Sequence, residues 1–317
     1  MTERLDGTVA LVTGASSGIG HATARALANN GAAVALVARR KERLDELAAT
    51  IEKDGGRALA VEADITDKAQ AQGAVEKTVS ELGRLDTVVN NAGVMLLGPA
   101  ESAPIEEWER MVALNVSGLL YVSHAALPHL LKAAEDGERQ VADLVNISSV
   151  AGRVARGSSG VYNLTKFGVT AFTEALRQEV GGRHVRISVV EPGAVATELI
   201  THVRREVLAE LAKRFGKMEV LLSEDIADAV AYIVTRPHRV AVNEMLVRPA
   251  NQENVAPPAD PLALARHAAL GVAPRRRSWR ISCVRRTQFL RSAVRSPKLP
   301  SRFTASKSAF ERADSRA

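Results

Sequence analysis

A tyrosine and a lysine four residues apart, Tyr162 and Lys166, form the pair in this sequence with the most direct chemical meaning. On a helix, residues at this spacing lie on the same face. A lysine ammonium beside a phenol favours the phenolate and lowers a pKa that starts at about 10. The pair therefore predicts a general acid/base that works near neutral pH, although one such pair can also arise by chance.

Two serines, Ser148 and Ser149, follow the β-rich run at residues 141–147. A hydroxyl at the end of a strand could hydrogen-bond a substrate oxygen and stabilise the charge that develops on it. Ser149 precedes Tyr162 by 13 residues. Serines that merely end a strand are common, and for these two taken alone that alternative stays open.

A glycine-rich segment at residues 13–20 (TGASSGIG) separates an apolar run at 8–12 from an Ala- and Leu-rich stretch at 19–29. Glycines let the backbone turn tightly and approach a pyrophosphate, and the helix that follows offers free N–H groups and a partial positive charge. The spacing is G-x-x-x-G-x-G, not the G-x-G-x-x-G of the commonest dinucleotide fold. The predicted phosphate-binding residues are Gly14, Ser16, Ser17, Gly18, Ile19 and Gly20.

Two arginines, Arg39 and Arg40, follow the second apolar run at residues 33–38. A cofactor with a free ribose 2′-hydroxyl calls for an acid at this place, whereas guanidinium groups bind a 2′-phosphate. The sequence therefore predicts NADP(H) in preference to NAD(H). The alternative is that both arginines only open a solvated helix.

Two more loops follow predicted strands and should border the same crevice, because ligands bind at the carboxyl ends of parallel strands. Asp64 and Ile65 come after the run at 57–61, and we expect Asp64 to meet the adenine. Asn91, Ala92 and Gly93 come after the run at 85–89. Small residues permit close contact there, although an ordinary turn would look the same.

These residues need a scaffold, and the apolar pattern predicts one. Short apolar strands are expected at residues 8–12, 33–38, 57–61, 85–89, 141–147, 185–190 and 245–247. Helices are expected between them at residues 19–29, 41–53, 67–82, 105–132, 161–180 and 224–235. Strands that are apolar on both faces, each followed by a helix, indicate a parallel sheet covered on both sides. We predict an α/β, doubly wound Rossmann-type fold with a seven-stranded parallel sheet in one catalytic domain, residues 1–256.

The last part of the chain has a different composition. Of the 317 residues, 46% are hydrophobic and 25% charged, which is ordinary for a globular protein, and the formal net charge is +6. Residues 257–317 hold 12 Arg, 2 Lys and only 3 acids, so the basic character belongs to them. They also hold 6 of the 12 prolines and eight serines. We predict a disordered basic tail, and binding of nucleic acid or an anionic membrane surface through it stays open.

Composition also excludes several classes of protein. The single cysteine, Cys283, excludes an internal disulfide framework and a zinc site built from a cluster of cysteines, and no metal is expected. No apolar run reaches about 18 residues, so we expect no membrane span. Residues 1–6 carry two acids and no apolar run, so we expect no secretory signal and a cytoplasmic location.

Taken together, these motifs resemble the short-chain dehydrogenase/reductase family over residues 5–250. The resemblance is carried by TGASSGIG at 13–20, NNAG at 90–93, LNVSG around Asn115, SS at 148–149, YNLTK at 162–166 and PGAVAT at 192–197. It implies a catalytic set with Tyr162 as acid/base, Ser149 positioning the substrate oxygen and Lys166 holding the nicotinamide ribose. Asn115 would hold a water that relays protons from Lys166.

The resemblance also implies that Pro192, Gly193, Val195 and Thr197 border the nicotinamide. Residues 239–252 (RVAVNEMLVRPANQ) resemble the end of NADP-dependent reductases of small aldehydes and 3-hydroxy acids, such as clavulanate dehydrogenase and 3-hydroxy acid dehydrogenases. The implied partners are a small carbonyl or alcohol substrate and further copies of the chain, as a homotetramer or dimer.

The sequence thus favours an NADPH-dependent oxidoreductase that reduces a small aldehyde or ketone, or in reverse oxidises a secondary alcohol or 3-hydroxy acid. The alternative is an NADP-binding regulatory or nucleic-acid-associated protein that uses its basic tail. Residues 198–220 should vary with the substrate. A substrate carboxylate held there by Arg204 or Arg205 is one possibility, and a solvated basic face is the other.

Overall fold

The computed structural model describes residues 3–209 and 219–252, and the tail predicted at 257–317 lies outside the described residues. The described part contains one seven-stranded parallel sheet, in the order β3-β2-β1-β4-β5-β6-β7. The strands are β1 (Val9–Thr13), β2 (Ala33–Ala38), β3 (Arg57–Glu62), β4 (Thr87–Asn90), β5 (Ala142–Ile147), β6 (Val185–Pro192) and β7 (Glu244–Val247). The predicted doubly wound sheet is therefore confirmed. Its order reverses between β1 and β4, which is where such folds open a ligand crevice.

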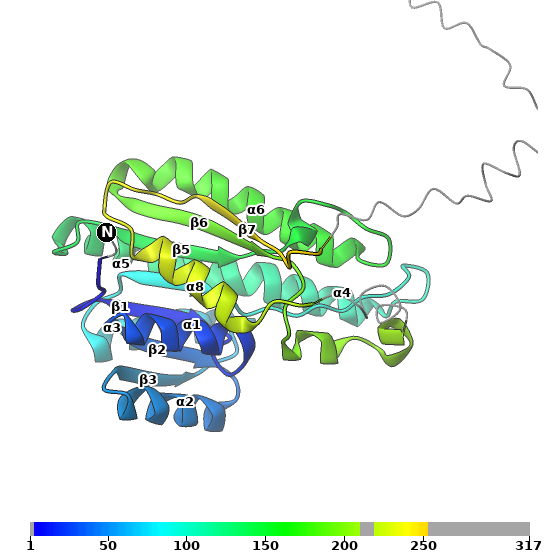
Figure 1. Ribbon diagram of the computed structural model, residues 1–317, viewed down its shortest axis with the longest axis horizontal. Helices are drawn as coiled ribbons and strands as arrows, with labels where there is room; N and C mark the ends of the chain where they lie inside the picture. Colours follow the sequence, from blue (N-terminus) through cyan, green and yellow to red (C-terminus); the bar gives the residue numbers. More distant parts are fainter. Residues whose placement is uncertain (1–2, 210–218, 253–317) are drawn as a thin grey trace, which may run out of the picture. The chain divides into compact units, whose positions relative to one another are not determined.

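Helices cover both faces of this sheet (Figure 1). Helices α1 (Gly18–Asn29), α2 (Lys41–Lys53) and α8 (Ser223–Val234) pack on one face. Helices α3 (Lys68–Leu82), α5 (Leu119–Asp136) and α6 (Gly160–Val180) pack on the other, and α4 (Ile105–Val112) leads into α5. Short 3-10 turns connect the rest: η2 (Val150–Gly152), η3 (Gly181–Arg183) and η4 (Glu198–His202).

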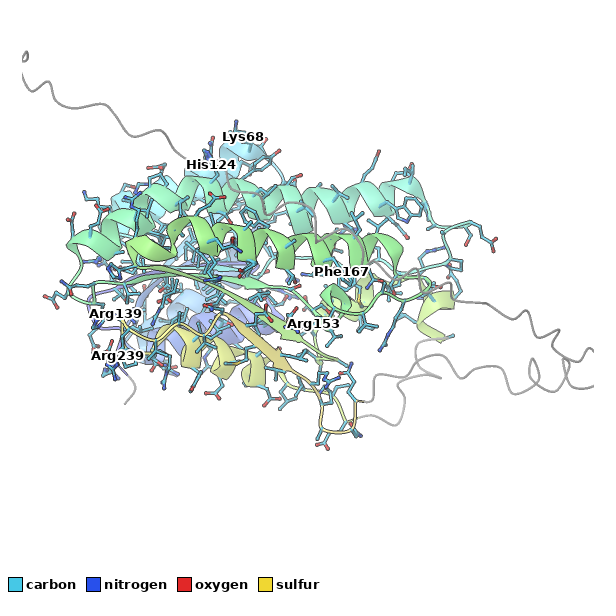
Figure 2. The ribbon with its side chains drawn as sticks, turned by 90° about the horizontal axis from the view of Figure 1, so that it is seen from above. Lys68, His124, Arg139, Arg153, Phe167 and Arg239 are labelled. Carbon is cyan, nitrogen blue, oxygen red and sulfur yellow. The ribbon has the colours of Figure 1, made fainter. Side chains whose placement is uncertain are left out.

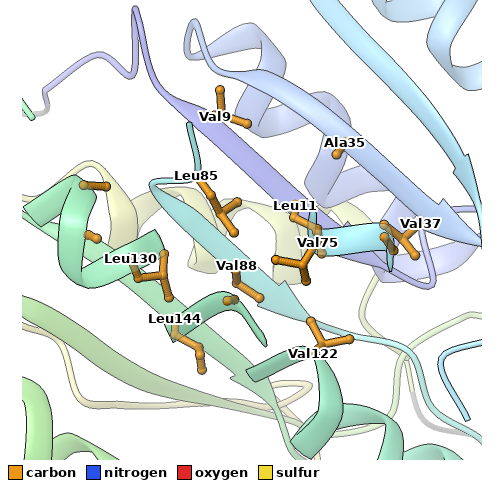
Figure 3. Close-up of a cluster of buried hydrophobic side chains, with 14 of the residues drawn as sticks. Val9, Leu11, Ala35, Val37, Val75, Leu85, Val88, Val122, Leu130 and Leu144 are labelled. Carbon is orange, nitrogen blue, oxygen red and sulfur yellow. The ribbon is translucent and has the colours of Figure 1, made fainter. Parts of the chain in front are cut away.

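The strands divide their side chains between two cores, because successive residues of a strand point to opposite faces. In β1, Val9 and Leu11 join the core beneath α3 and α5, shown in Figure 3. Ala10 and Val12 join the core beneath α1 and α8. Both faces are thus dry, which is why the sequence shows continuous apolar runs and no alternation with polar residues.

The predicted helix at residues 105–132 differs from the structure, because a π-helical turn, η1 (Ala113–Gly118), separates α4 from α5. Asn115 lies in this turn and is buried. Its side-chain amide binds the backbone of Val94 in the neighbouring loop. Such turns occur at functional sites, and the contact that fixes this one comes from a distant segment. Periodicity in the sequence could not reveal it.

One stretch meets the length and composition of a membrane span, which differs from the sequence prediction of none. It covers Ile105–Asp136, with a mean hydropathy of 1.3 over its most apolar window, of which 39% is buried inside the protein. Length and composition alone are weak evidence for a span. Val122, Ala126 and Leu130 of this stretch belong to the core against the sheet, which is how a core helix of a globular protein behaves.

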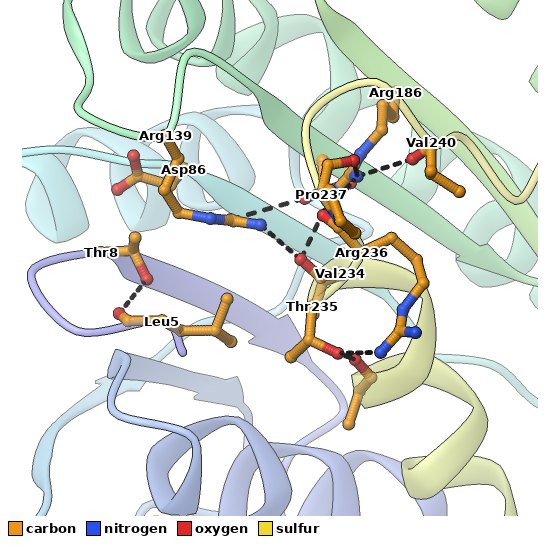
Figure 4. A network of polar contacts seen from close by, with 12 residues as sticks. Leu5, Thr8, Asp86, Arg139, Arg186, Val234, Thr235, Arg236, Pro237 and Val240 are labelled. Atoms are coloured by element: carbon orange, nitrogen blue, oxygen red, sulfur yellow. Dashed lines mark hydrogen bonds and ion pairs between the residues drawn. The ribbon is translucent and has the colours of Figure 1, made fainter. Parts of the chain in front are cut away.

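A buried ionic cluster closes the end of the sheet where the strands begin (Figure 4). Arg186 of β6 donates through Nε and Nη2 to the two carboxylate oxygens of Asp143 in β5, at 2.7 and 2.8 Å. It also donates to the carbonyls of Val234, Arg236 and Val240, which hold the α8–β7 loop. Arg139, whose guanidinium lies 3.8 Å from the Asp143 carboxylate, belongs to the same cluster. Figure 2 shows Arg139 at this end and Arg153, which follows β5, toward the other.

Candidate active site

A cavity of about 1530 Å³ lies where the strands end, bordered by residues that follow β1, β2, β4, β5 and β6. Most of the predicted site residues line it: Gly14, Ser16, Ser17, Gly18, Ile19, Arg39, Arg40, Asp64, Ile65, Asn91, Ala92, Gly93, Ser149, Tyr162, Lys166, Pro192, Gly193, Val195 and Thr197. Gly20 and Asn115 do not line it. They lie directly behind it and shape its wall.

The glycine-rich loop has the conformation that its composition predicts. Gly14 and Gly18 have φ of +68° and +56°, a region that disfavours residues with a Cβ. A Cβ on Gly14 would also lie 2.9 Å from the Cα of Ala92, and one on Gly20 would collide with the Gly14 carbonyl oxygen. At Gly14 and Gly20 the loop is therefore packed too closely for a side chain. It leaves backbone N–H groups at the start of α1 free to bind an anion.

Asn90, the last residue of β4, and Asn91, which follows it, hold this framework in place. Asn91 donates from Nδ2 to the Thr13 carbonyl at 2.9 Å, and its backbone N–H donates to the Thr13 hydroxyl. Asn90 instead donates to the side chains of Ser123 and Asn146. The Asn91 side chain therefore ties the loop after β4 to the end of β1, and Asn91 also lines the cavity.

The Tyr162 and Lys166 side chains lie together at the first turns of α6. Both are buried, with 7% and 6% of their surfaces exposed, and the ammonium lies 5.9 Å from the centre of the phenol ring. The Lys166 ammonium donates to the Ile147 carbonyl at 2.9 Å. A Cβ on Gly93 would lie 3.9 Å from the Lys166 Nζ, an ordinary van der Waals contact, so the loop after β4 runs directly beside the ammonium.

The surroundings of Tyr162 move its pKa in the direction opposite to the one predicted from spacing. Burial raises the pKa of Tyr162 to about 12, although a hydrogen bond with Ser149 opposes the rise. Burial also lowers the pKa of Lys166 to about 8. The prediction from spacing was a phenol below its usual pKa. It was wrong because desolvation of the phenolate outweighs an ammonium that lies 5.9 Å away and is hydrogen-bonded elsewhere.

The two serines after β5 have different surroundings. Ser148 is tied to α6, with its hydroxyl 3.1 Å from the Lys166 carbonyl and 3.0 Å from the Thr170 hydroxyl. Ser149 accepts from the Ala151 backbone N–H at 3.1 Å and meets Tyr162 across the cavity. Ser149 is therefore the serine whose hydroxyl is placed beside the phenol.

Asn115 lies behind this pair. Its Oδ1 accepts from the Val94 N–H at 2.8 Å, and its Nδ2 donates to the Val94 carbonyl and to the Thr165 hydroxyl. A Cβ on Gly93 would lie 3.3 Å from the Asn115 Oδ1. Asn115 thus joins the loop after β4 to the start of α6.

The two arginines after β2 are placed differently from each other. Arg40 donates to the hydroxyls of Ser16 and Ser17 at 2.8–3.1 Å and to Glu198 at 2.8 Å. Arg39 is 64% exposed and lies 3.8 Å from Asp64. Arg40 is therefore fixed beside the glycine-rich loop, whereas Arg39 reaches along the end of β3.

The family model described as short chain dehydrogenase matches residues 8–208. The chain belongs to this family. The glycine betaine reductase ATRR of Emericella nidulans is 39% identical over 78% of this chain, which spans only 19% of that longer protein.

Two solved structures show the same fold as this short-chain dehydrogenase. The closed form of serine dehydrogenase complexed with NADP+ is 31% identical, with a TM-score of 0.71, and the match covers 78% of this chain and 96% of that one. A 3-ketoacyl-(acyl-carrier-protein) reductase from Brucella melitensis complexed with NADH is 32% identical, with a TM-score of 0.68, over 77% and 98%. One neighbour is thus complexed with NADP+ and the other with NADH. The closer likeness to clavulanate and 3-hydroxy acid dehydrogenases stays a prediction.

The further residues of this short-chain dehydrogenase that line the cavity include Arg156, Glu198 and His202. Arg156 was not singled out from the sequence, whereas Glu198 and His202 belong to the segment 198–220 that we expected to vary with the substrate. Arg156 lies on the η2–α6 loop, where Asn163 accepts from its backbone N–H at 3.2 Å. Within the described residues its guanidinium has no acidic partner. No motif marks these positions, because only the folded chain brings them to the cavity.

Neither arginine suggested for a substrate carboxylate, Arg204 or Arg205, lines the cavity. Arg204 lies 3.1 Å from Glu107 of α4 and 3.3 Å from Glu206. Its charge is therefore already neutralised by the protein. Arg156 is better placed to meet a substrate anion.

Proposed function

We propose that this short-chain dehydrogenase uses NADPH to reduce a small aldehyde or ketone, and in reverse oxidises a secondary alcohol or 3-hydroxy acid. The observation that carries the proposal is the position of the Tyr162 phenol, buried beside Ser149 in a cavity that continues to the glycine-rich loop. A proton donor, Tyr162, and a hydroxyl that can donate a hydrogen bond to the substrate oxygen, that of Ser149, thus lie together at one end of this cavity.

Several features of the chain fit a bound NADP(H). The glycine-rich loop would hold the pyrophosphate on the N-terminus of α1, because Gly14 and Gly20 have no room for a side chain and let the backbone come close. Arg40, with Arg39 beside it, would bind a 2′-phosphate, and Lys166 would reach the nicotinamide ribose. The relative complexed with NADP+ supports the same preference. The relative complexed with NADH shows that the fold also accepts the other cofactor, and between the two the arginines favour NADP(H).

The chain's own residues would then supply the proton and the alignment. The bound cofactor supplies the hydride. Ser149 and Tyr162 would hold the carbonyl oxygen by hydrogen bonds, so that the negative charge developing there is stabilised. A phenol with a pKa of about 12 remains protonated at neutral pH and is a donor for reduction. Lys166, with a pKa of about 8, can return a proton to the phenolate, and Asn115 would order the path behind it.

The class of substrate is proposed from the part of the cavity around Tyr162. The lining near Tyr162 mixes apolar groups with the guanidinium of Arg156. Such a site accepts a small carbonyl compound, and a carboxylate on it would pair with Arg156.

The test is a pair of variants assayed with NADPH against aldehydes, ketones and 3-oxo acids. Tyr162→Phe should bind NADPH as the wild type does and lose turnover by several orders of magnitude, because the proton donor is gone. Ser149→Ala should cut turnover and spare cofactor affinity. A Tyr162→Phe variant with near wild-type rates would show that the donor lies elsewhere.

A further inference from the structure

Glu198 is one of three acidic residues that line the cavity in the described part of the chain, with Asp64 and Glu224. It opens η4 directly after Thr197, and its carboxylate reaches the corner between β2 and α2. One oxygen accepts from Arg40 at 2.8 Å and the other from Arg43 at 2.6 Å. The hydrogen bonds from Arg43 and Arg40 lower the pKa of Glu198 to about 2, so the carboxylate is ionised throughout the neutral range.

The guanidinium of Arg40 has little donor capacity left. It has five N–H donors. Its Nε and Nη2 donate to the hydroxyls of Ser16 and Ser17, and its Nη1 donates to Glu198. The Glu198 carboxylate thus occupies Nη1, the one nitrogen of Arg40 that the serine hydroxyls do not use and that an anion could bind. A ribose 2′-phosphate bound to Arg40 would have to displace Glu198 or lie beside its charge.

We propose that Glu198 is an internal competitor for the 2′-phosphate of NADP(H), and that it sets how strongly this enzyme prefers NADP(H) over NAD(H). The inference rests on the proposed function, in which Arg40 binds that phosphate. NAD(H) has a hydroxyl at the same position and does not need the guanidinium. Its affinity is therefore nearly independent of Glu198.

The opposite role for Glu198 predicts the opposite sign. A carboxylate that only orients Arg40 and Arg43 would raise the affinity for a 2′-phosphate, and its removal would weaken NADPH binding. Competition is favoured because a phosphate monoester carries a charge of about −1.5 to −2 at neutral pH and would share one guanidinium with a second anion. Glu198 is 44% exposed, so screening by water keeps the effect to roughly three- to tenfold.

The experiment measures binding to the full chain by isothermal titration calorimetry, with NADPH and NADH and without substrate. Glu198→Gln should tighten NADPH by roughly three- to tenfold and leave NADH within about twofold, because the amide keeps the size and loses the charge. Glu224→Gln is the matched control. Glu224 also lines the cavity and makes no ion pair within the described residues, so its removal should shift NADPH and NADH alike.

A double-mutant cycle tests the route through Arg40. In an Arg40→Gln background, Glu198→Gln should no longer tighten NADPH, because the group for which the two anions compete is absent. Unchanged or weaker NADPH binding by Glu198→Gln alone would overturn the inference, and so would a gain that persists without Arg40. A protein that shows the expected binding changes but reduces no carbonyl compound would contradict the proposed function and support the competition.

Discussion

Raising the pH should switch off carbonyl reduction through Lys166. Lys166 is 6% exposed and its ammonium donates to one carbonyl, that of Ile147, so burial lowers its pKa to about 8. If a protonated Lys166 must return a proton to Tyr162, about a tenth of the molecules remain competent at pH 9. The value of kcat/KM for reduction should then fall roughly tenfold between pH 7 and pH 9, and alcohol oxidation should rise over the same range.

The assay follows loss of NADPH absorbance with a neutral ketone, at saturating NADPH and low ketone concentration. Circular dichroism at each pH checks that the fold is intact. Lys166→Arg is the decisive control, because a guanidinium stays protonated across this range. The variant should be slower at every pH, but its loss between pH 7 and pH 9 should vanish. A flat wild-type profile, or an equal loss in Lys166→Arg, would refute the reasoning.

The other predictions concern the cofactor, the fold, the tail and the assembly. Ala38→Asp with Arg39→Gln should weaken NADP(H) and improve NAD(H) in calorimetry, since a lost charge-assisted pair costs about 1.5–3 kcal/mol; a wild type that already prefers NAD(H) contradicts this. Arg186→Met leaves Asp143 buried without its bidentate partner and should lower the free energy of unfolding in urea by about 3–5 kcal/mol, with cofactor affinity kept; an unchanged urea midpoint argues against it. Truncation after Pro257 should leave kcat/KM nearly unchanged, and a large loss would give the tail a role in the site. Light scattering should show a dimer or tetramer, because α5 and α6 expose apolar side chains, and a micromolar monomer would count against this.

The sequence by itself determined the features that depend on neighbouring residues. The continuous apolar runs of the strands and the helical spacing between them predicted the parallel sheet, because those patterns follow from backbone geometry. The glycine-rich loop was equally local. A positive φ at Gly14 and Gly18 and close packing against Ala92 require residues without a Cβ, and the composition at residues 13–20 shows that directly.

Only the tertiary structure decided the features that depend on distant residues. Arg40 and Glu198 are 158 positions apart, so no motif could join them. The π-helical turn at Asn115 is held by the backbone of Val94. The pKa of Tyr162 depends on desolvation by everything packed around the ring, which a lysine at i+4 does not reveal. Chain spacing determines which side chains share a helix face, whereas charge and protonation depend on what the fold places around them.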